Sequence, residues 1–270
     1  MSPSLRGVSV RDALDSAVIP LRAAKVDTPR LDAEVLLAHC MGVDRAALIV
    51  DPARELEGPA TRCFQAAMRR RVFEHEPVAY IVGRKGFRHI ELEVDPRVLI
   101  PRPETEHLVE AGLTLPQGAS VVDVGTGSGA VALALKDERP DLMLTATDID
   151  EDALAVARAN AERLRLEVAF VHADLLPEGI AFDAVVANLP YVGVRDRFPN
   201  RHEPMRALFG GQDGLDAIRR LVERVDSPFV ALEVGEGQSR EVAELLVAKG
   251  YSTEVIPDLA GIERVVVGRR

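Results

Sequence analysis

Residues 120 to 135 read SVVDVGTGSGAVALAL, an apolar run followed by a glycine-rich turn and a second apolar run. The first run predicts a buried strand, and the second, rich in alanine and leucine, predicts a helix. Gly125, Gly127 and Gly129 lack the Cβ that would keep a ligand away from the backbone. The start of the helix offers unpaired N–H groups to such a ligand. The stretch therefore predicts a strand–turn–helix unit of an α/β sheet, with a binding site at the turn.

Strand and helix patterns continue to alternate from this stretch to the end of the chain. Strands separated by helix-length segments indicate a parallel sheet with helices on both faces. Residues 251–270 hold two predicted strands that are too close together for a crossover helix, so we expect an antiparallel edge pair. The fold class predicted for residues 101–270 is α/β, with a doubly wound, mostly parallel seven-stranded sheet of the Rossmann-like kind.

The first 78 residues have the pattern of helices. Apolar residues at helical spacing follow Ser9, a candidate N-cap. Pro29 at a first helical position and Gly42 near a helix end mark a second helix. A third long helix is expected before Pro77. We interpret residues 1–78 as a small helical domain.

The segment that follows the helices is rich in β-forming residues. Gly83 and Gly86 interrupt it, which suggests a β-hairpin linker. The predicted domain boundaries are 1–78 for the helical domain, 79–100 for the linker and 101–270 for the α/β domain.

The charge of the chain argues against direct contact with nucleic acid. The net charge of the 270 residues is −10. Residues 1–85 carry 13 Lys/Arg and 11 Asp/Glu, so the remainder carries 20 against 32. Such an acidic body is unsuited to tight nonspecific binding, which depends on phosphate neutralisation. The basic cluster Arg69 to Arg71 is interpreted as a solvated helix face, with docking to an RNA-bearing or acidic partner as the alternative.

The sequence predicts a cytoplasmic protein. The N-terminus lacks the basic stretch and apolar block of a signal peptide. No run approaches the roughly 18 apolar residues of a membrane helix. Cys40 and Cys63 have neither metal-ligand spacing nor a disulfide framework, so we expect two reduced cysteines and no metal. We further expect a monomer that does not bind membranes.

The glycine pattern alone leaves the ligand open. Asp148 ends the next predicted strand, 23 residues beyond Gly125, where a carboxylate can accept from both hydroxyls of a ribose. Gly125, Gly127 and Ala130 also satisfy the G-x-G-x-x-G/A pattern of dinucleotide sites. A purely structural glycine turn is a third interpretation.

Three features favour S-adenosylmethionine over a nicotinamide cofactor. Asp123 lies two residues before the first glycine, where it can meet the cationic methionine end. Asp174 can accept from an adenine amino group while Leu175 packs on the ring. The fourth strand ends on a polar amide, Asn188. The predicted cofactor-binding residues are Asp123, Gly125, Thr126, Gly127, Ser128, Gly129, Asp148, Asp174, Leu175 and Asn188.

The polar strand end at residues 188–191, Asn-Leu-Pro-Tyr, is suited to a planar nitrogen. The lone pair of such a nitrogen is delocalised, and two acceptors on its hydrogens would aim it at a methyl group. The Asn188 side-chain oxygen and the Leu189 backbone carbonyl are the predicted acceptors. Pro190 keeps Leu189 extended, and Tyr191 offers an aromatic face for stacking. No general base with a tuned pKa is required, since positioning and preorganisation supply most of the acceleration.

Residues 188–191 resemble the Asn-Pro-Pro-Tyr signature of methyltransferases that alkylate planar nitrogens. Adenine N6-methyltransferases and release-factor glutamine N5-methyltransferases both carry it. Residues 76–110 are similar to the segment that joins the two domains in the glutamine family, and IPRPETE at 100–106 is its most specific part. Residues 203–221 and 232–238 resemble later motifs of that family, so the resemblance covers nearly the whole chain from about residue 9.

The resemblance to the glutamine family implies an activity and a partner. It implies that the helical domain docks a peptide chain release factor, and that the α/β domain methylates the glutamine of its Gly-Gly-Gln loop at N5, with S-adenosylmethionine as donor. The residues implied in catalysis and substrate binding are Asn188, Leu189, Pro190, Tyr191 and Arg102.

The chain departs from the family pattern at Leu189, where proline is usual. Because the expected role belongs to a backbone carbonyl, we expect the change to be tolerated. A Gly-Gly-Gln at 210–212 mimics the substrate loop and is interpreted as a coincidence in a turn. Arg102 and Glu104 are expected either to close over donor or target, or to pair with each other.

Two other functions compete with glutamine methylation. An adenine-N6 methyltransferase acting on RNA or DNA shares residues 188–191 but should carry a basic face, whereas this α/β domain is acidic. A catalytically silent binding module would keep the fold and dock through the helical domain. The intact residues Asp123, Asp148, Asn188 and Tyr191 argue against it.

Overall fold

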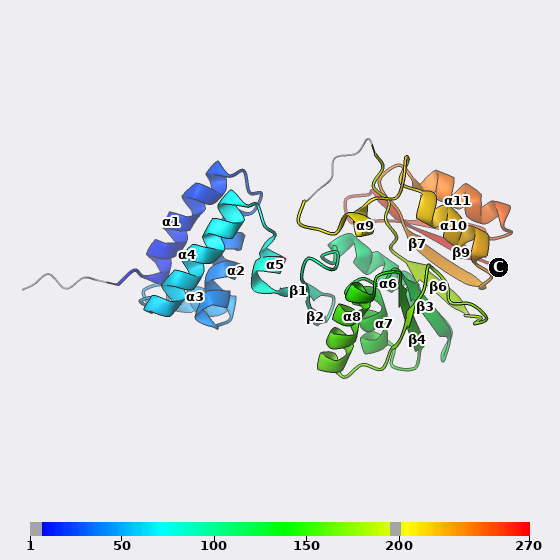
Figure 1. Cartoon of the computed structure of the whole chain (residues 1–270), viewed down its shortest axis with the longest axis horizontal. Helices are drawn as coiled ribbons and strands as arrows, with labels where there is room; N and C mark the ends of the chain where they lie inside the picture. The colour runs from blue at the N-terminus through cyan, green and yellow to red at the C-terminus, as the bar shows by residue number, and fades with distance from the viewer. Residues whose placement is uncertain (1–6, 195–200) are drawn as a thin grey trace, which may run out of the picture. The chain divides into compact units, whose positions relative to one another are not determined.

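The chain divides into two units, the first ending at Gly83 and the second beginning at Arg84 (Figure 1). The computed structural model describes residues 7–194 and 201–270. Each unit has a hydrophobic core of its own. Within the described residues, no helix is both long and apolar enough to span a bilayer.

Unit 1 is made of helices. Their bounds are α1 (Val10–Ala23), α2 (Pro29–Met41), α3 (Arg45–Val50), α4 (Gly58–Phe73) and α5 (Val78–Val82). Ser9 caps α1, where its hydroxyl accepts from the Asp12 N–H at 3.2 Å. Gly42 ends α2 with φ of 64°, a conformation that glycine adopts without strain. The three long helices are those expected from the sequence, and leucines of α1 and α2 form much of their core.

The short helices α3 and α5 were not expected. Asp44 starts α3 by accepting from the Ala46 N–H at 2.7 Å. Helix α5 lies between Pro77 and Gly83, within a segment whose β-forming residues suggested a strand. Its Ile81 is buried in the core of unit 1, so tertiary packing outweighs local propensity there.

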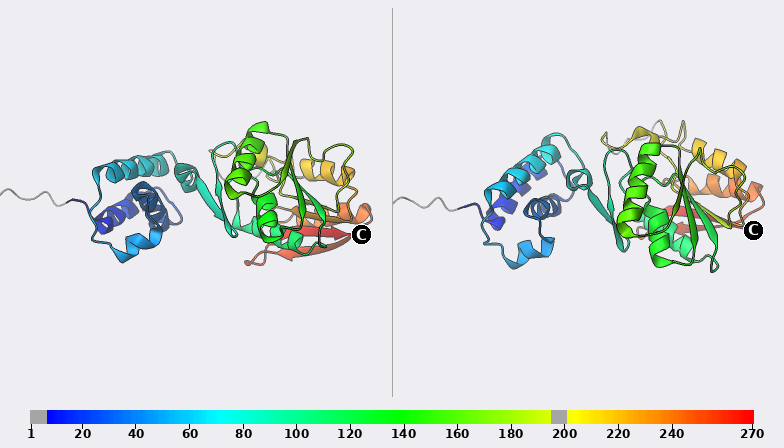
Figure 2. Two further views of the ribbon diagram at one scale, coloured as in Figure 1. Left: turned by 90° about the horizontal axis from the view of Figure 1, so that it is seen from below. Right: turned by 60° about the horizontal axis from the view of Figure 1, so that its bottom comes forward.

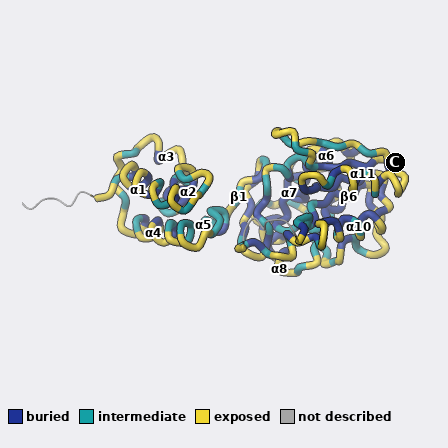
Figure 3. Tube along the Cα trace, turned by 90° about the horizontal axis from the view of Figure 1, so that it is seen from above, coloured by how far each residue is buried: buried dark blue, intermediate teal, exposed yellow. Residues whose placement is uncertain are grey.

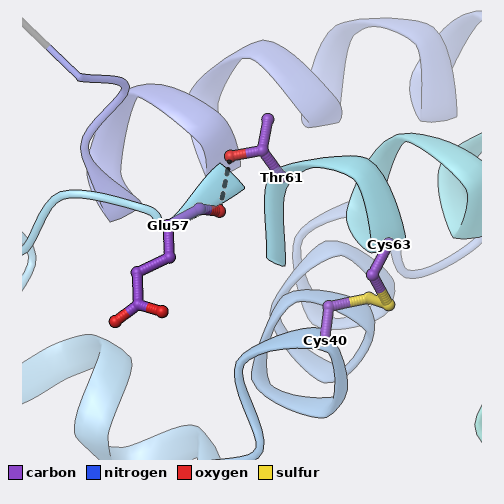
Figure 4. Close-up of a disulfide and its surroundings, with 4 residues drawn as sticks. All are labelled: Cys40, Glu57, Thr61 and Cys63. Atoms are coloured by element: carbon purple, nitrogen blue, oxygen red, sulfur yellow. Dashed lines mark hydrogen bonds between the residues drawn. A yellow bond between two sulfur atoms is a disulfide. The ribbon is translucent and has the colours of Figure 1, made fainter. Parts of the chain in front are cut away.

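The expectation of two reduced cysteines was wrong. Cys40 of α2 and Cys63 of α4 form a disulfide, with their Cα atoms 5.5 Å apart (Figure 4). Helices α2 and α4 contact each other in the core of unit 1. This packing brings together two residues that are 23 positions apart in the sequence, at a separation that suits a disulfide. Spacing along the chain could not reveal the pairing.

Unit 2 begins with an antiparallel hairpin of β1 (Arg84–Phe87) and β2 (Ile90–Glu93). The hairpin contacts α7 (Ala130–Glu138) and α8 (Glu151–Leu164). Asn160 of α8, fully buried, accepts from the Glu93 N–H at 2.7 Å and donates to its carbonyl at 2.9 Å. These bonds fix β2 against the sheet domain.

The main sheet of unit 2 has seven strands in the order β5-β4-β3-β6-β7-β9-β8. Their bounds are β3 (Ser120–Val124), β4 (Met143–Asp148), β5 (Ala169–His172), β6 (Ala184–Ala187), β7 (Phe229–Glu233), β8 (Ser252–Pro257) and β9 (Glu263–Arg269). The first five strands run parallel, while β9 is antiparallel to both β7 and β8. The predicted fold class and the antiparallel final pair are confirmed, although only β8 of that pair is an edge strand, because β9 lies between β7 and β8.

Helices cover both faces of the sheet (Figures 1 and 2). The remaining helices are the 3-10 helix η1 (Pro103–Thr105), α6 (Glu106–Leu113), α9 (Met205–Leu208), α10 (Asp216–Arg224) and α11 (Ser239–Ala248). One face packs on α10 and α11, where Val122 and Val185 join residues such as Leu221 and Leu246 in one core. Buried positions gather in the interior of unit 2, around β6 (Figure 3).

The order of strands reverses between β3 and β6, because β4 lies on one side of β3 and β6 on the other. The chain leaves β3 at Gly125 and leaves β6 at Asn188. Ligands of open α/β sheets bind beyond the carboxyl ends of the strands at such a switch point. The topology therefore brings the glycine turn and the Asn-Leu-Pro-Tyr stretch to the same place.

Candidate active site

The glycine turn after β3 is held by backbone bonds. The N–H groups of Gly125 and Thr126 both donate to the Thr147 carbonyl at 2.9 Å. The three glycines have φ of 72°, 56° and 84°. At Gly129 an added Cβ would lie 2.9 Å from Leu133 Cδ1, so this glycine serves close helix packing. At Gly127 it would meet nothing within 4 Å, which leaves that backbone open to a ligand.

Asp123 lies under the turn with its carboxylate buried. Its Oδ2 accepts from the Thr126 hydroxyl at 2.6 Å and from the Ala132 N–H at 3.1 Å. Burial raises the pKa of Asp123 to about 6, although both hydrogen bonds oppose the shift. A cation beside this carboxylate would favour its ionised form.

Asp148, at the end of β4, is tied to two loops. Its Oδ2 accepts from the Gly127 N–H and its Oδ1 from the Asp150 N–H, both at 2.9 Å. Burial raises the pKa of this carboxyl above its usual value. Each oxygen keeps a second lone pair, so Asp148 can still accept from hydroxyl groups.

Two cavities meet at this edge of the sheet. The larger, of about 480 Å³, is within the range of small-molecule sites. The smaller holds about 50 Å³ and lies against Asp123. Gly125, Gly127, Leu99 and Asn188 line both. The larger cavity brings together the predicted residues Asp148, Asp174, Leu175, Leu189 and Pro190, and the smaller adds Asp123, Thr126, Ser128 and Arg102.

Asp174 and Leu175 lie side by side on the larger cavity, after β5. Leu175 is buried and its carbonyl accepts from the Thr147 hydroxyl at 2.8 Å. Asp174 pairs with Arg220 of α10 and is half exposed. Because Arg220 already pairs with the Asp174 carboxylate, a ligand at this position would share that carboxylate with the arginine.

Asn188 borders both cavities and is oriented by Thr105, because its Nδ2 donates to the Thr105 hydroxyl at 3.1 Å. Its Oδ1 accepts no hydrogen bond from the described residues. The Leu189 carbonyl likewise has no donor among them, while the Leu189 side chain is buried against Gly125. The two acceptors predicted for a planar nitrogen are thus both available.

Tyr191 is placed differently from the other three residues of the stretch. It is not among the described residues that line either cavity. Its hydroxyl donates to Glu233 Oε1 at 3.5 Å, and its carbonyl accepts from Gln238 Nε2 at 3.0 Å. Burial raises the pKa of Tyr191 to about 12, so its hydroxyl remains a donor.

Arg102 pairs with Glu203, at 2.6 Å, and not with Glu104. The Glu203 side chain is 1% exposed, and its second oxygen accepts from the Ile100 N–H at 3.2 Å. The pair fastens the IPRPETE segment to the residues before α9. Arg102 thereby reaches the smaller cavity with its charge already balanced.

The Gly-Gly-Gln at 210–212 lies in the turn before α10. An added Cβ on Gly210 would be 2.3 Å from the Pro190 carbonyl oxygen, and one on Gly211 would overlap Asp216. Both glycines are therefore required by close packing. The turn supports the Asn-Leu-Pro-Tyr stretch, since the Gly210 N–H donates to the Val192 carbonyl.

Comparison with known proteins gives two family matches and a set of close relatives. The profile of the PrmC N-terminal domain matches residues 12–83, and that of the methyltransferase small domain matches residues 104–201. A release factor glutamine methyltransferase of Koribacter versatilis is 42% identical over 97% of this chain and 99% of its own length. The chain belongs to the release factor glutamine methyltransferase family. A Pseudomonas aeruginosa member is also 42% identical, over 90% of this chain and 94% of its own.

A solved structure agrees with this membership. The E. cuniculi Mtq2-Trm112 complex, responsible for methylation of the eRF1 termination factor, matches with a TM-score of 0.51 and 25% identity. The match covers 64% of this chain and 99% of that one. The family is that of protein-glutamine N5 methyltransferases that use S-adenosylmethionine.

The residues of the two cavities fit S-adenosylmethionine. Each cavity carries a carboxylate, Asp148 on the larger and Asp123 on the smaller. Gly127 lines both cavities and leaves the space that a Cβ would fill. A ligand with ribose hydroxyls at one end and an ammonium group at the other suits this set of groups.

Several residues that shape this family site were not predicted. Thr105 lies inside IPRPETE, and Glu233 lies inside LEVGEGQ, residues 232–238. Both segments resemble motifs of the family, and that resemblance is the signal that could have pointed to these two residues. Asn160 donates to the Ser128 carbonyl at 3.0 Å and so supports the glycine turn from α8. Glu203 is a charged residue that the fold buries. Only the packing reveals these roles.

Proposed function

We propose that this enzyme methylates the side-chain amide nitrogen of the glutamine in the Gly-Gly-Gln loop of peptide chain release factors. The observation that carries the proposal is that Asn188 lines both cavities, with its nitrogen held by Thr105 and its amide oxygen free of any donor among the described residues. The 42% identity to release factor glutamine methyltransferases supports glutamine as the target.

In the proposed mechanism Asn188 and Leu189 bind the target amide. The Asn188 Oδ1 accepts one N–H of the glutamine side chain, and the Leu189 carbonyl accepts the other. Two acceptors favour pyramidalisation of a nitrogen whose lone pair is otherwise delocalised. Pro190 restricts Leu189 to extended backbone and so holds the carbonyl in place. Most of the acceleration then comes from orientation and preorganised dipoles.

Other residues hold the cofactor in this proposal. When bound, S-adenosylmethionine supplies an electrophilic methyl group, and the net reaction exchanges one amide proton for that methyl. Asp148 accepts from the ribose hydroxyls, and Asp123 faces the ammonium group. Asp174 and Leu175 border the adenine, with Arg220 sharing the Asp174 carboxylate. Thr126, Ser128 and the glycines form the turn around it.

We assign the docking of the release factor to the helical part of the chain, with a functional boundary near residue 78 and residues 79–100 as its connection to the catalytic part. Translation termination places the proposed reaction in the cytoplasm. We further propose that the enzyme acts as a monomer without direct contact to nucleic acid, as its net charge of −10 favours.

The test is a methylation assay on a purified release factor. Incubation with enzyme and S-adenosylmethionine should add the mass of one methylene to the peptide that holds Gly-Gly-Gln. Fragmentation should place the methyl on the glutamine side chain. A release factor with Gln replaced by Ala serves as control. No transfer to the release factor, with methylation of adenine in RNA instead, would overturn the proposal.

A further inference from the structure

Glu233 is a buried acid next to the proposed catalytic residues. It is the last residue of β7 and is 1% exposed. Its Oε2 has no hydrogen-bond partner among the described residues. Burial of a carboxylate without full pairing is costly, so such a group calls for a functional reason.

The neighbours of Glu233 lead to Asn188. The Tyr191 hydroxyl donates to its Oε1 at 3.5 Å. The Thr105 hydroxyl lies near enough to this carboxyl to lower its pKa by hydrogen bonding. The same Thr105 oxygen accepts from Asn188 Nδ2 at 3.1 Å. Glu233 is therefore next to Tyr191, and only the Thr105 hydroxyl separates it from Asn188.

A hydroxyl group has one proton to donate, and this decides which way Asn188 turns. An ionised Glu233 can only accept, so the Thr105 proton points to it. The Thr105 lone pairs then accept from Asn188 Nδ2, and the Asn188 oxygen is turned away toward the cavities. With a neutral group at position 233, the Thr105 hydroxyl can rotate and donate its proton to the Asn188 oxygen instead.

We propose that Glu233 is a positioning residue, whose carboxylate orders the Thr105 hydroxyl and thereby presents the Asn188 oxygen to an amide N–H of the substrate. The inference rests on the proposed function. This orientation of Asn188 makes the site selective for a planar nitrogen that carries hydrogens, because the side-chain oxygen that faces the substrate can only accept. The orientation of Asn188 then depends on a charge that lies outside both cavities.

The protonation of Glu233 supports this relay. Burial raises its pKa to about 7, against the lowering effect of the Thr105 hydroxyl. Glu104 raises it further, while Arg264 and Tyr191 lower it. The carboxyl therefore ionises near neutral pH. We expect the rate of methyl transfer to rise with pH through about 7 as the carboxylate forms.

The test is Glu233→Gln, assayed on a release factor across pH 6 to 9. Glutamine keeps the shape but can donate to Thr105, which favours the wrong orientation of Asn188. We expect kcat to fall by about 10- to 100-fold, with the KM for S-adenosylmethionine unchanged and the rise through pH 7 lost. Glu254→Gln, in β8 and paired with Arg269 at the surface, is the matched control and should keep both kcat and pH profile.

A second pair of variants tests the same relay at Thr105. Thr105→Val removes the hydroxyl and should lower kcat as Glu233→Gln does, whereas Thr105→Ser should restore it. The double variant Glu233→Gln/Thr105→Val should be no slower than the slower single variant, because both act through one bond. Thermal melting confirms that each variant is folded.

The outcomes separate the two proposals. An active wild-type enzyme whose Glu233→Gln and Thr105→Val variants keep the wild-type kcat and pH profile would overturn the role of Glu233. A wild-type enzyme that binds S-adenosylmethionine but transfers no methyl to the release factor would overturn the proposed function itself.

Discussion

Among the described residues, the Asn188 side chain makes one hydrogen bond, from its nitrogen to Thr105, and its oxygen accepts none where the two cavities meet. A side chain held in this way loses little freedom when a substrate binds. Preorganised acceptors of this kind act mainly on the transition state. The residue should therefore matter for the chemical step more than for cofactor binding.

Replacing Asn188 by Ala is expected to lower the single-turnover rate by about 100-fold or more. The affinity for S-adenosylmethionine should change little, because the carboxylates and the glycine turn remain. Calorimetry gives the affinity, and rapid quench gives the rate. An unchanged rate constant would mean that the asparagine is structural.

Leu189→Pro is the companion variant. Its rate should stay near that of the wild type, since the proposed role belongs to the carbonyl. The Leu189 side chain is 4% exposed, however, and its loss should cost about 2 kcal/mol of stability.

Glu233 should make the stability of the enzyme depend on pH. Its pKa is about 7 in the folded protein against an ordinary value of 4.5, so the folded state binds more protons between these values. Stability is fully retained below pH 4.5 and falls as pH rises through 7, by about 3 kcal/mol in all. Glu233→Gln removes this loss.

The measurement is urea unfolding of both proteins from pH 4 to 8. Glu233→Gln should match the wild type at pH 4 and exceed it by up to about 3 kcal/mol at pH 8. A variant that is less stable than the wild type at pH 8 would contradict the assigned burial. Combined with the lower kcat expected above, a gain in stability would mark Glu233 as a residue kept for function.

At the scale of elements, α2 and α4 are joined by the disulfide between Cys40 and Cys63. A cross-link between residues 23 positions apart restricts the unfolded chain and stabilises the fold by about 3 kcal/mol. Reduction, or a double replacement by Ser, should lower the stability of unit 1 by about that amount. Hydrogen exchange resolved along the chain should show the loss within residues 7–83 and little change in the sheet.

Thiol alkylation and mass spectrometry of the protein prepared without reductant provide the control. An intact disulfide takes up label only after reduction. Label on both cysteines before reduction, or equal protection of α2 and α4 with and without the bond, would contradict the prediction.

The turn at Gly210 supports the loop that carries Pro190. An added Cβ would lie 2.3 Å from the Pro190 carbonyl oxygen and 2.5 Å from that of Gly214. Gly210→Ala should therefore displace the loop, cost about 1–3 kcal/mol of stability and lower kcat. Gly86→Ala, where a Cβ meets nothing within 4 Å, is the matched control. Equal kcat in both variants would show that the loop tolerates the shift.

At the scale of the whole molecule, all the described residues that line the two cavities belong to the sheet unit and none to the helical unit. Removal of residues 1–83 should therefore leave the affinity for S-adenosylmethionine within about twofold. The KM for an intact release factor should rise by about tenfold or more, because the proposed docking surface is lost.

A short peptide that contains Gly-Gly-Gln is the control substrate for this truncation. Since it makes no use of the docking surface, the truncated and full enzymes should methylate it at similar rates. A truncated enzyme that keeps the full KM for the release factor would show that docking resides in the sheet unit.

Much of the fold was predictable because its signals are local. The apolar strand before Gly125, the glycine turn and the alternation of strands and helices follow from periodicity and from the freedom of glycine. The position of Asn188 could be predicted for a similar reason, since a polar amide that directly follows a buried strand lies at the carboxyl end of that strand. The same local evidence placed Asp123, Asp148 and Asp174 at the ends of strands.

The tertiary structure alone decided how these residues are held. The bond from Asn188 to Thr105, the buried carboxyl of Glu233 and the pair of Arg102 with Glu203 each join positions far apart in the sequence. The disulfide is of the same kind. Periodicity reports which face of an element is buried, whereas these contacts depend on which elements the packing brings together, and no local pattern encodes that.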